Sequence, residues 1–209
     1  MKNLTTYLAS GALALALSAG TASAATIVNG GFEDVSGFTF TGGSWGIGIL
    51  NGWSSTSGGI EVQTQPTLGL TPDEGGYYVE LDGNNNYDLF QDVFLTAGRY
   101  ALSFAYSPRQ SDPLTNVMAF SVGSLLTGSI TGPGGVDLTT VGQWTPFTRE
   151  FTVTADNIYT LMFSGAGTDD SFGGLLDNIA MVAVPLPAGG LLLIGALGGL
   201  AFWRRRKTV

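Results

Sequence analysis

The chain has 209 residues, of which 44% are hydrophobic and only 11% charged, and it contains neither histidine nor cysteine. Their absence excludes Ser-His-Asp and Cys-His catalysis, the usual zinc and copper sites, and any disulfide framework. The formal net charge of −8 also argues against nucleic acid as a partner, because its phosphates would be repelled.

The N-terminal segment, residues 1–24, has the three parts of a secretory signal peptide. Lys2 supplies the positive charge, residues 8–19 form an apolar run, and Ala22 and Ala24 make an A-x-A cleavage site. The apolar run is too short for a first transmembrane helix. We therefore expect an exported protein whose mature chain begins after Ala24.

The next segment, residues 25–183, has the size of one extracellular domain, and its pattern is almost wholly β. Glycine-rich turns separate short runs, and no stretch shows a convincing helical period. In one run, Leu102, Phe104 and Tyr106 alternate with small residues, as in a half-buried strand. The expected strands are 77–82, 89–95, 100–106, 117–122, 147–153, 158–163 and 175–182. This spacing predicts an all-β fold, an antiparallel β-sandwich.

Charge within this domain is strongly one-sided. Residues 25–183 contain three arginines and all sixteen acidic residues, which gives a net charge of −13. Such a balance suits a soluble extracellular module and divalent cations. Without disulfides, the fold must be stabilised by its core, helped by a bound metal.

Without histidine or cysteine, the remaining route to hydrolysis is a pair of carboxylates, as in glycosidases. Glu61, Glu80, Asp82, Asp88 and Asp92 are the candidates. Several of them lie at strand ends or beside turns, where carboxylates are usually solvated. We therefore expect no catalytic residues and no enzyme.

A second acidic feature is the alternation of oxygen ligands at Asp82, Asn84, Asn86 and Asp88, which is similar to the start of a calcium loop. However, Tyr87 stands where an EF-hand needs glycine. We interpret the segment as a polar hairpin turn.

Aromatic residues are candidates for stacking against sugar rings. Trp53 and Trp144 stand where a sandwich core often buries a tryptophan. Trp45 lies in a glycine-rich stretch, residues 42–48, and is the most plausible exposed platform. We take Trp45 as the ligand-binding candidate, with loop packing as the alternative.

The C-terminal segment has the features of a membrane anchor. Residues 186–203 form a run of eighteen residues without a charge, which as a helix spans about 27 Å, enough for a bilayer core. The run ends at Trp203, a typical interfacial residue. A basic cluster that stops transfer follows at once: Arg204, Arg205, Arg206 and Lys207. By the positive-inside rule, the rest of the chain faces outward.

Residues 184–209 as a whole resemble the VPLPA variant of the PEP-CTERM sorting signal. The motif residues are Val184, Pro185, Leu186, Pro187 and Ala188. The resemblance implies a Gram-negative bacterium that makes extracellular polysaccharide. It also implies an inner-membrane precursor, an exosortase-type membrane protease as partner, and delivery to the cell surface or matrix. Leu186 stands where the commoner Pro-Glu-Pro form has glutamate, and a plain uncut anchor remains the alternative.

The body of the chain also resembles a known group. Residues 29–33, 76–83, 89–93, 97–104 and 176–179 carry short motifs that recur, in this order, in the galactose-binding-like jelly roll of carbohydrate-binding modules and DUF642 proteins. The resemblance implies a two-sheet sandwich, binding of glycans such as extracellular polysaccharide, and a structural calcium near the chain ends.

Within that resemblance, Glu33 and Asp177 match the positions from which the family supplies calcium ligands. We expect them to meet and to share a Ca²⁺ ion. The sequence thus predicts a non-catalytic, glycan-binding or biofilm-associated surface module. The alternatives are a purely structural surface protein and, more remotely, a carboxylate-dependent glycosidase.

Overall fold

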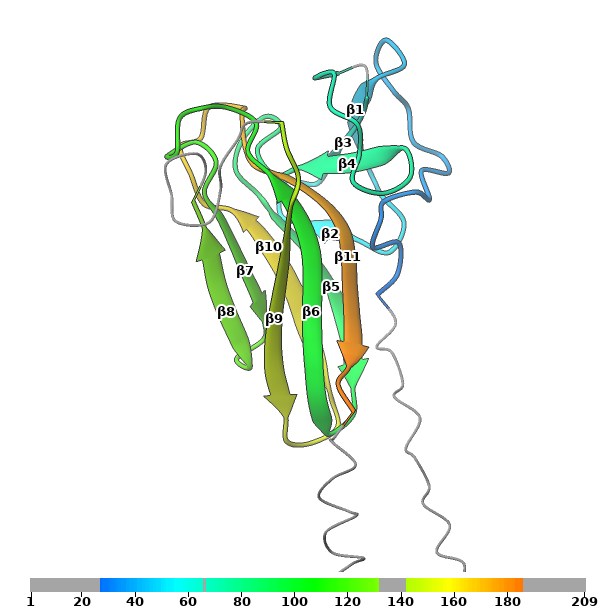
Figure 1. Ribbon diagram of the computed structural model, residues 1–209. Coiled ribbons are helices and arrows are strands. Elements are labelled where there is room, and N and C mark those ends of the chain that lie inside the picture. Colours follow the sequence, from blue (N-terminus) through cyan, green and yellow to red (C-terminus); the bar gives the residue numbers. More distant parts are fainter. Residues whose placement is uncertain (1–26, 66, 132–141, 186–209) are drawn as a thin grey trace, which may run out of the picture.

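The computed structural model describes residues 27–65, 67–131 and 142–185 (Figure 1). The predicted signal peptide, the motif from Leu186 onward, the expected membrane helix and the basic cluster lie outside the described residues. Within the described part of the chain, no helix is long and apolar enough to cross a membrane.

The described residues form eleven strands and contain no helix, so the all-β prediction is confirmed. The strands are β1 (Trp45–Gly48), β2 (Ser54–Ser55), β3 (Ile60–Thr64), β4 (Tyr77–Glu80), β5 (Asp88–Leu95), β6 (Gly98–Ser107), β7 (Met118–Val122), β8 (Leu126–Ile130), β9 (Thr145–Val153), β10 (Asn157–Gly165) and β11 (Leu175–Ala183).

These strands make two antiparallel sheets that pack face to face as a jelly-roll sandwich (Figure 1). One sheet has six strands in the order β1-β3-β4-β11-β6-β9, and the other has five in the order β2-β5-β10-β7-β8. Non-consecutive neighbours such as β4 and β11 show that the chain crosses repeatedly between the sheets. The prediction of a β-sandwich with antiparallel strands is therefore confirmed.

The core lies between the two sheets and is rich in aromatic rings. Leu102, Phe104 and Tyr106 on β6 are buried, as their alternation predicts. The ring of Phe104 lies 5.2 Å from that of Phe120 on β7 and 5.1 Å from that of Phe163 on β10, centroid to centroid. Edge-to-face contacts of this kind join the six-stranded sheet to the five-stranded one.

The six-stranded sheet is unusual at β3 and β4 because both of its faces are buried there. Val62 and Val79 pair across these strands and belong to the core between the sheets. Glu61 and Glu80 pair on the opposite face, yet they too are buried. Loops therefore cover this outer face, and this covered region is where polar side chains gather.

Candidate functional site

The candidate site is built on two rows of side chains that cross the outer face of the six-stranded sheet. Strand register places Trp45 opposite Gln63, and Ile47 opposite Glu61. The next pair of strands places Glu61 opposite Glu80. Directly opposed residues in an antiparallel pair share a face, so these side chains form one continuous surface.

The three acidic residues of this region are buried, with exposed fractions of 6% for Glu61 and 0% for both Glu80 and Asp82. The expectation that they are solvated surface carboxylates is wrong. The physical reason is coverage by distant segments, because Arg109 and residues 170–173 fold over the sheet and bond to the carboxylates. Asp92 is exposed and Asp88 half-buried, closer to the expectation.

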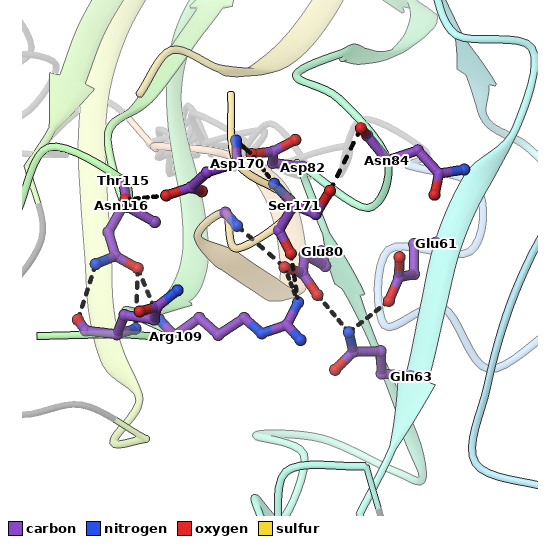
Figure 2. Close-up of polar contacts among 12 residues, drawn as sticks. Glu61, Gln63, Glu80, Asp82, Asn84, Arg109, Thr115, Asn116, Asp170 and Ser171 are labelled. Carbon is purple, nitrogen blue, oxygen red and sulfur yellow. Dashed lines mark hydrogen bonds and ion pairs between the residues drawn. The ribbon is translucent and has the colours of Figure 1, made fainter. Parts of the chain in front are cut away.

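Glu80 is the centre of the polar network (Figure 2). The Nε2 atom of Gln63 donates to Oε1 of Glu61 at 2.7 Å and also to Oε2 of Glu80. Arg109 forms an ion pair with Oε1 of Glu80, and the N–H of Gly173 donates to the same oxygen at 3.0 Å. Three donors from three segments thus converge on one buried carboxylate.

Asp82 holds the loop between β10 and β11 against the end of β4. Its Oδ2 atom accepts the N–H groups of Asp170 and Ser171, each at 3.0 Å. Asp170 in turn accepts a hydrogen bond from the hydroxyl of Thr115 at 2.8 Å. The segment that begins at Asp82 thus acts as an anchor for a neighbouring loop, as expected of a polar turn.

Burial dominates the electrostatics of this cluster. It raises the pKa of Glu80 to about 8, although the Arg109 ion pair and the Gly173 N–H act in the opposite direction. Burial also raises the pKa of Glu61 and the pKa of Asp82 above their usual values. The cluster therefore binds protons more readily than solvated carboxylates do.

Two cavities open above the cluster. The larger, of about 180 Å³, is lined by Trp45, Thr67, Arg109 and Ser171. The smaller, of about 70 Å³, is lined by Ile47, Ser57, Gly59, Asn85 and Tyr87. Both are also lined by Glu61, Gly83 and Asn84, so Glu61 is the carboxylate common to the two.

The predicted ligand residue Trp45 lies on the wall of the larger cavity with 38% of its surface exposed. The guanidinium of Arg109 lies on the same cavity and stacks 4.8 Å from the ring centre of the exposed Phe172. In contrast, Trp53 is buried in the core, as predicted, and Trp144 packs edge-on against Tyr78. The cavity therefore combines a partly exposed aromatic residue with charged and hydroxyl groups.

The two predicted metal ligands, Glu33 and Asp177, both bond to one segment, residues 73–77. Oε1 of Glu33 accepts the backbone N–H groups of residues 76 and 77 at 2.9 and 3.0 Å. Oδ2 of Asp177 accepts those of residues 73 and 74 at 2.9 and 3.1 Å. Both carboxylates thus anchor the segment that leads into β4.

These hydrogen bonds bear on the predicted calcium. Oδ1 of Asp177 also accepts the N–H of Asn178, so three of the four carboxylate oxygens have N–H donors, and only Oε2 of Glu33 has none among the described residues. Among residues 27–65, 67–131 and 142–185, no three acidic side chains gather closely enough to hold a metal ion. The oxygens are hard donors of the kind calcium prefers, and the shared Ca²⁺ stays a prediction.

The sequence missed Gln63 and Arg109 as members of the site. Residues 60–64 alternate apolar and polar side chains, which is a strand signal that could have found β3 and Gln63. Arg109 is one of only three basic residues in the domain, against sixteen acidic ones. Because acidic residues greatly outnumber basic ones, each arginine is expected to form an ion pair with a carboxylate.

Comparison with known proteins supports the fold. No protein-family model and no curated protein sequence matches the chain. Among solved structures, the apo form of a cyclase from Fischerella sp. is 14% identical with a TM-score of 0.56, over 79% of this chain and 98% of that one. The Stig cyclase Fisc from Fischerella sp. TAU is 17% identical with a TM-score of 0.55, over 80% of this chain and all of the other.

A carbohydrate-binding module, TmCBM61 in complex with beta-1,4-galactotriose, is 20% identical with a TM-score of 0.46, over 75% of this chain and 96% of that one. At these identities, the similarity concerns the fold alone. The function of the chain must therefore be argued from its own site.

The first prediction concerns pH. The pKa of Glu80 is raised to about 8 and that of Asp177 to about 7, well above the unfolded values of about 4. The stability these groups contribute is fully present below the unfolded pKa and is lost as pH rises through the folded pKa. The chain has no histidine, so no side chain of ordinary pKa titrates between about pH 5.5 and 8.5. We expect the melting temperature of the full chain to fall across this range, measured in EGTA at constant ionic strength.

Substitution identifies the groups responsible. Glu80→Gln should flatten the pH dependence above about pH 7 and reduce its slope below, whereas Asp177→Asn should reduce the slope only below about pH 7. Asp92→Asn removes an exposed carboxylate and should leave the slope unchanged. A wild-type melting temperature that is constant, or that rises with pH, would contradict the assignment.

The second prediction concerns calcium. A ligand that binds only the folded state at one hundred times its Kd stabilises the protein by about 2.7 kcal/mol. We expect millimolar calcium to raise the melting temperature of the full chain relative to EGTA, and Asp177→Ala to abolish the increase. If wild-type protein melts identically in both solutions, Glu33 and Asp177 serve only as hydrogen-bond acceptors for the loop.

Proposed function

We propose that the protein is an exported, non-catalytic module of the cell surface or extracellular matrix that binds a glycan in the larger cavity. The observation that carries the proposal is the position of Trp45, a partly exposed aromatic residue that lines a polar cavity. A sugar ring has an apolar C–H face that suits an aromatic platform, and hydroxyl groups that need polar partners close by.

The rest of the lining supports this proposal. Glu61 provides hydrogen-bond acceptors for sugar hydroxyls, and Arg109 provides donors on the same cavity. Trp45 and Glu61 lie on paired strands of the sheet. The site is therefore largely formed before a ligand arrives, so binding costs little conformational entropy.

The lining also favours binding over hydrolysis. A glycosidase places two carboxyl groups on either side of the bond it breaks. Glu61 is the one carboxylate among the described residues that line either cavity. Glu80 is fully buried, and both of its oxygens accept hydrogen bonds. We therefore propose that the module binds its glycan without cleaving it.

A second candidate function is proton donation by Glu61 to a bound small molecule. Burial raises the pKa of this cavity-lining carboxyl, which is the property a general acid needs. Among the structures of similar fold, those named above with TM-scores above 0.5 are cyclases. Acid catalysis by a single carboxyl is thus the enzymatic alternative to simple binding.

We further propose that an exosortase-type protease of a Gram-negative inner membrane processes the precursor at the motif beginning with Val184 and Pro185. The support is the order of the C-terminal features in the sequence, namely the proline motif, the uncharged run and the basic end. The polysaccharide matrix outside the cell would then supply the glycan.

The third prediction tests this sorting. Peptide mass mapping of mature protein from the producing cell should find no peptide from residues 202–207, because cleavage near Pro185 removes them. Protein at the surface that all retains this end would reduce the segment to a plain anchor.

The fourth prediction tests glycan binding. A glycan array probed with the full chain in mild detergent should give specific ligands, and Trp45→Ala should weaken binding to the best one at least tenfold, about 1.4 kcal/mol. Phe94→Ala is the matched control, since Phe94 is an exposed aromatic residue on the other sheet and is 60% exposed. This variant should bind like the wild type.

Two outcomes would contradict the proposal. One is the absence of any bound glycan, which would favour a purely structural surface protein. The other is sustained release of reducing ends from the bound oligosaccharide that is lost in Glu61→Gln, which would establish the enzymatic alternative.

A further inference from the structure

The smaller cavity has a chemical character of its own. Glu61 lines it and is only 6% exposed, so its carboxylate is held in a largely water-free position. Oε1 of Glu61 accepts the Gln63 amide, whereas Oε2 accepts no hydrogen bond from the residues that the structure describes. This oxygen lies beside Gly83, which also lines the cavity, so a ligand that brings a donor there can form a charge-assisted hydrogen bond with it.

The positive charge that could satisfy Glu61 within the protein is already committed. Arg109 donates through Nη1 to Glu80 and to the carbonyl of Ser171. Its guanidinium lines only the larger of the two cavities. The described lining of the smaller cavity includes no lysine or arginine, and its polar groups are hydroxyls and the amides of Asn84 and Asn85.

From this arrangement, we propose that the smaller cavity binds a primary ammonium group, so that the ligand is a glycan containing unacetylated amino sugars. This inference rests on the proposed function and names the class of glycan. An ammonium donating to Glu61 makes a charge-assisted hydrogen bond, which is about twice as strong as a neutral one. The volume of about 70 Å³ accommodates a group of a few heavy atoms.

The two cavities also fix the direction of the ligand. A cation in the larger cavity would share it with Arg109, whereas the described lining of the smaller cavity has no basic residue and offers amide and hydroxyl oxygens beside the Glu61 carboxylate. The ring that stacks on Trp45 is therefore placed in the larger cavity, with the amino group directed into the smaller one. The domain's net charge of −13 favours cationic ligands over uronic acids or sulfated sugars.

The test compares three β-1,4-linked hexasaccharides by isothermal titration with the full chain: glucosamine, N-acetylglucosamine and glucose. At about pH 5.5, where most of its amines carry a positive charge, the glucosamine hexamer should bind at least tenfold more tightly than the other two. Glu61→Gln should abolish this preference while the glucose hexamer still binds. Asn85→Asp, which adds a carboxylate to the smaller cavity, should increase the preference.

The controls separate this site from general attraction between opposite charges. Glu150→Gln removes one exposed carboxylate from β9, far from the cavities in the sheet order, and should keep the full preference. A preference that survives in Glu61→Gln, or that Glu150→Gln reduces equally, overturns the inference. If all three hexamers bind with equal affinity and binding depends on Trp45, the amino-sugar inference is overturned but the proposed function stands. If neither these hexamers nor any arrayed glycan binds, the inference and the proposed function are both overturned.

Discussion

The burial of Glu80 is the constraint on which the rest of this site depends. A carboxyl group with no exposed surface is tolerated only when donors surround it, and here they come from β3, from the Arg109 segment and from the loop before β11. Each donor ties its own segment to the outer face of the sheet. The network that solvates Glu80 is thus also what builds the floor beneath both cavities.

This arrangement helps to explain how so acidic a domain holds together without disulfides. The aromatic core around Phe104 joins the two sheets, but it does not reach the loops on the outer face. There, a separate apolar cluster around Tyr78 holds the loops together with buried carboxylates, which accept backbone N–H groups as Asp82 and Asp177 do. Such contacts fix loop geometry closely, because each requires both a short distance and a defined direction.

The sequence carries most of the fold but little of the site. Alternation predicts β6 and β7 because one face of each packs on the core and the other carries smaller or more exposed residues. The same rule fails at Glu61 and Glu80, because it predicts that polar residues on the face opposite the core are exposed to solvent. What buries them is chain more than twenty residues away, and a local pattern holds no information about such coverage.

The predicted meeting of Glu33 and Asp177 shows a different limit. Their motifs lie at opposite ends of the domain, and the structure does bring both onto the loop before β4. The sequence indicates which residues converge, since the first and last segments of this fold are neighbours. It does not show that each carboxylate accepts hydrogen bonds from backbone N–H groups of a third segment.

Gly83 constrains which substitutions this module can accept during evolution. A Cβ atom there would lie 2.3 Å from Oε2 of Glu61, so any other residue would displace the carboxylate shared by both cavities. The next two residues, Asn84 and Asn85, are exposed, and their side chains make no hydrogen bond within the described part of the chain. One fixed glycine is thus followed by two positions that evolution can vary freely. A family of such modules could diversify its ligands there while its framework stays unchanged.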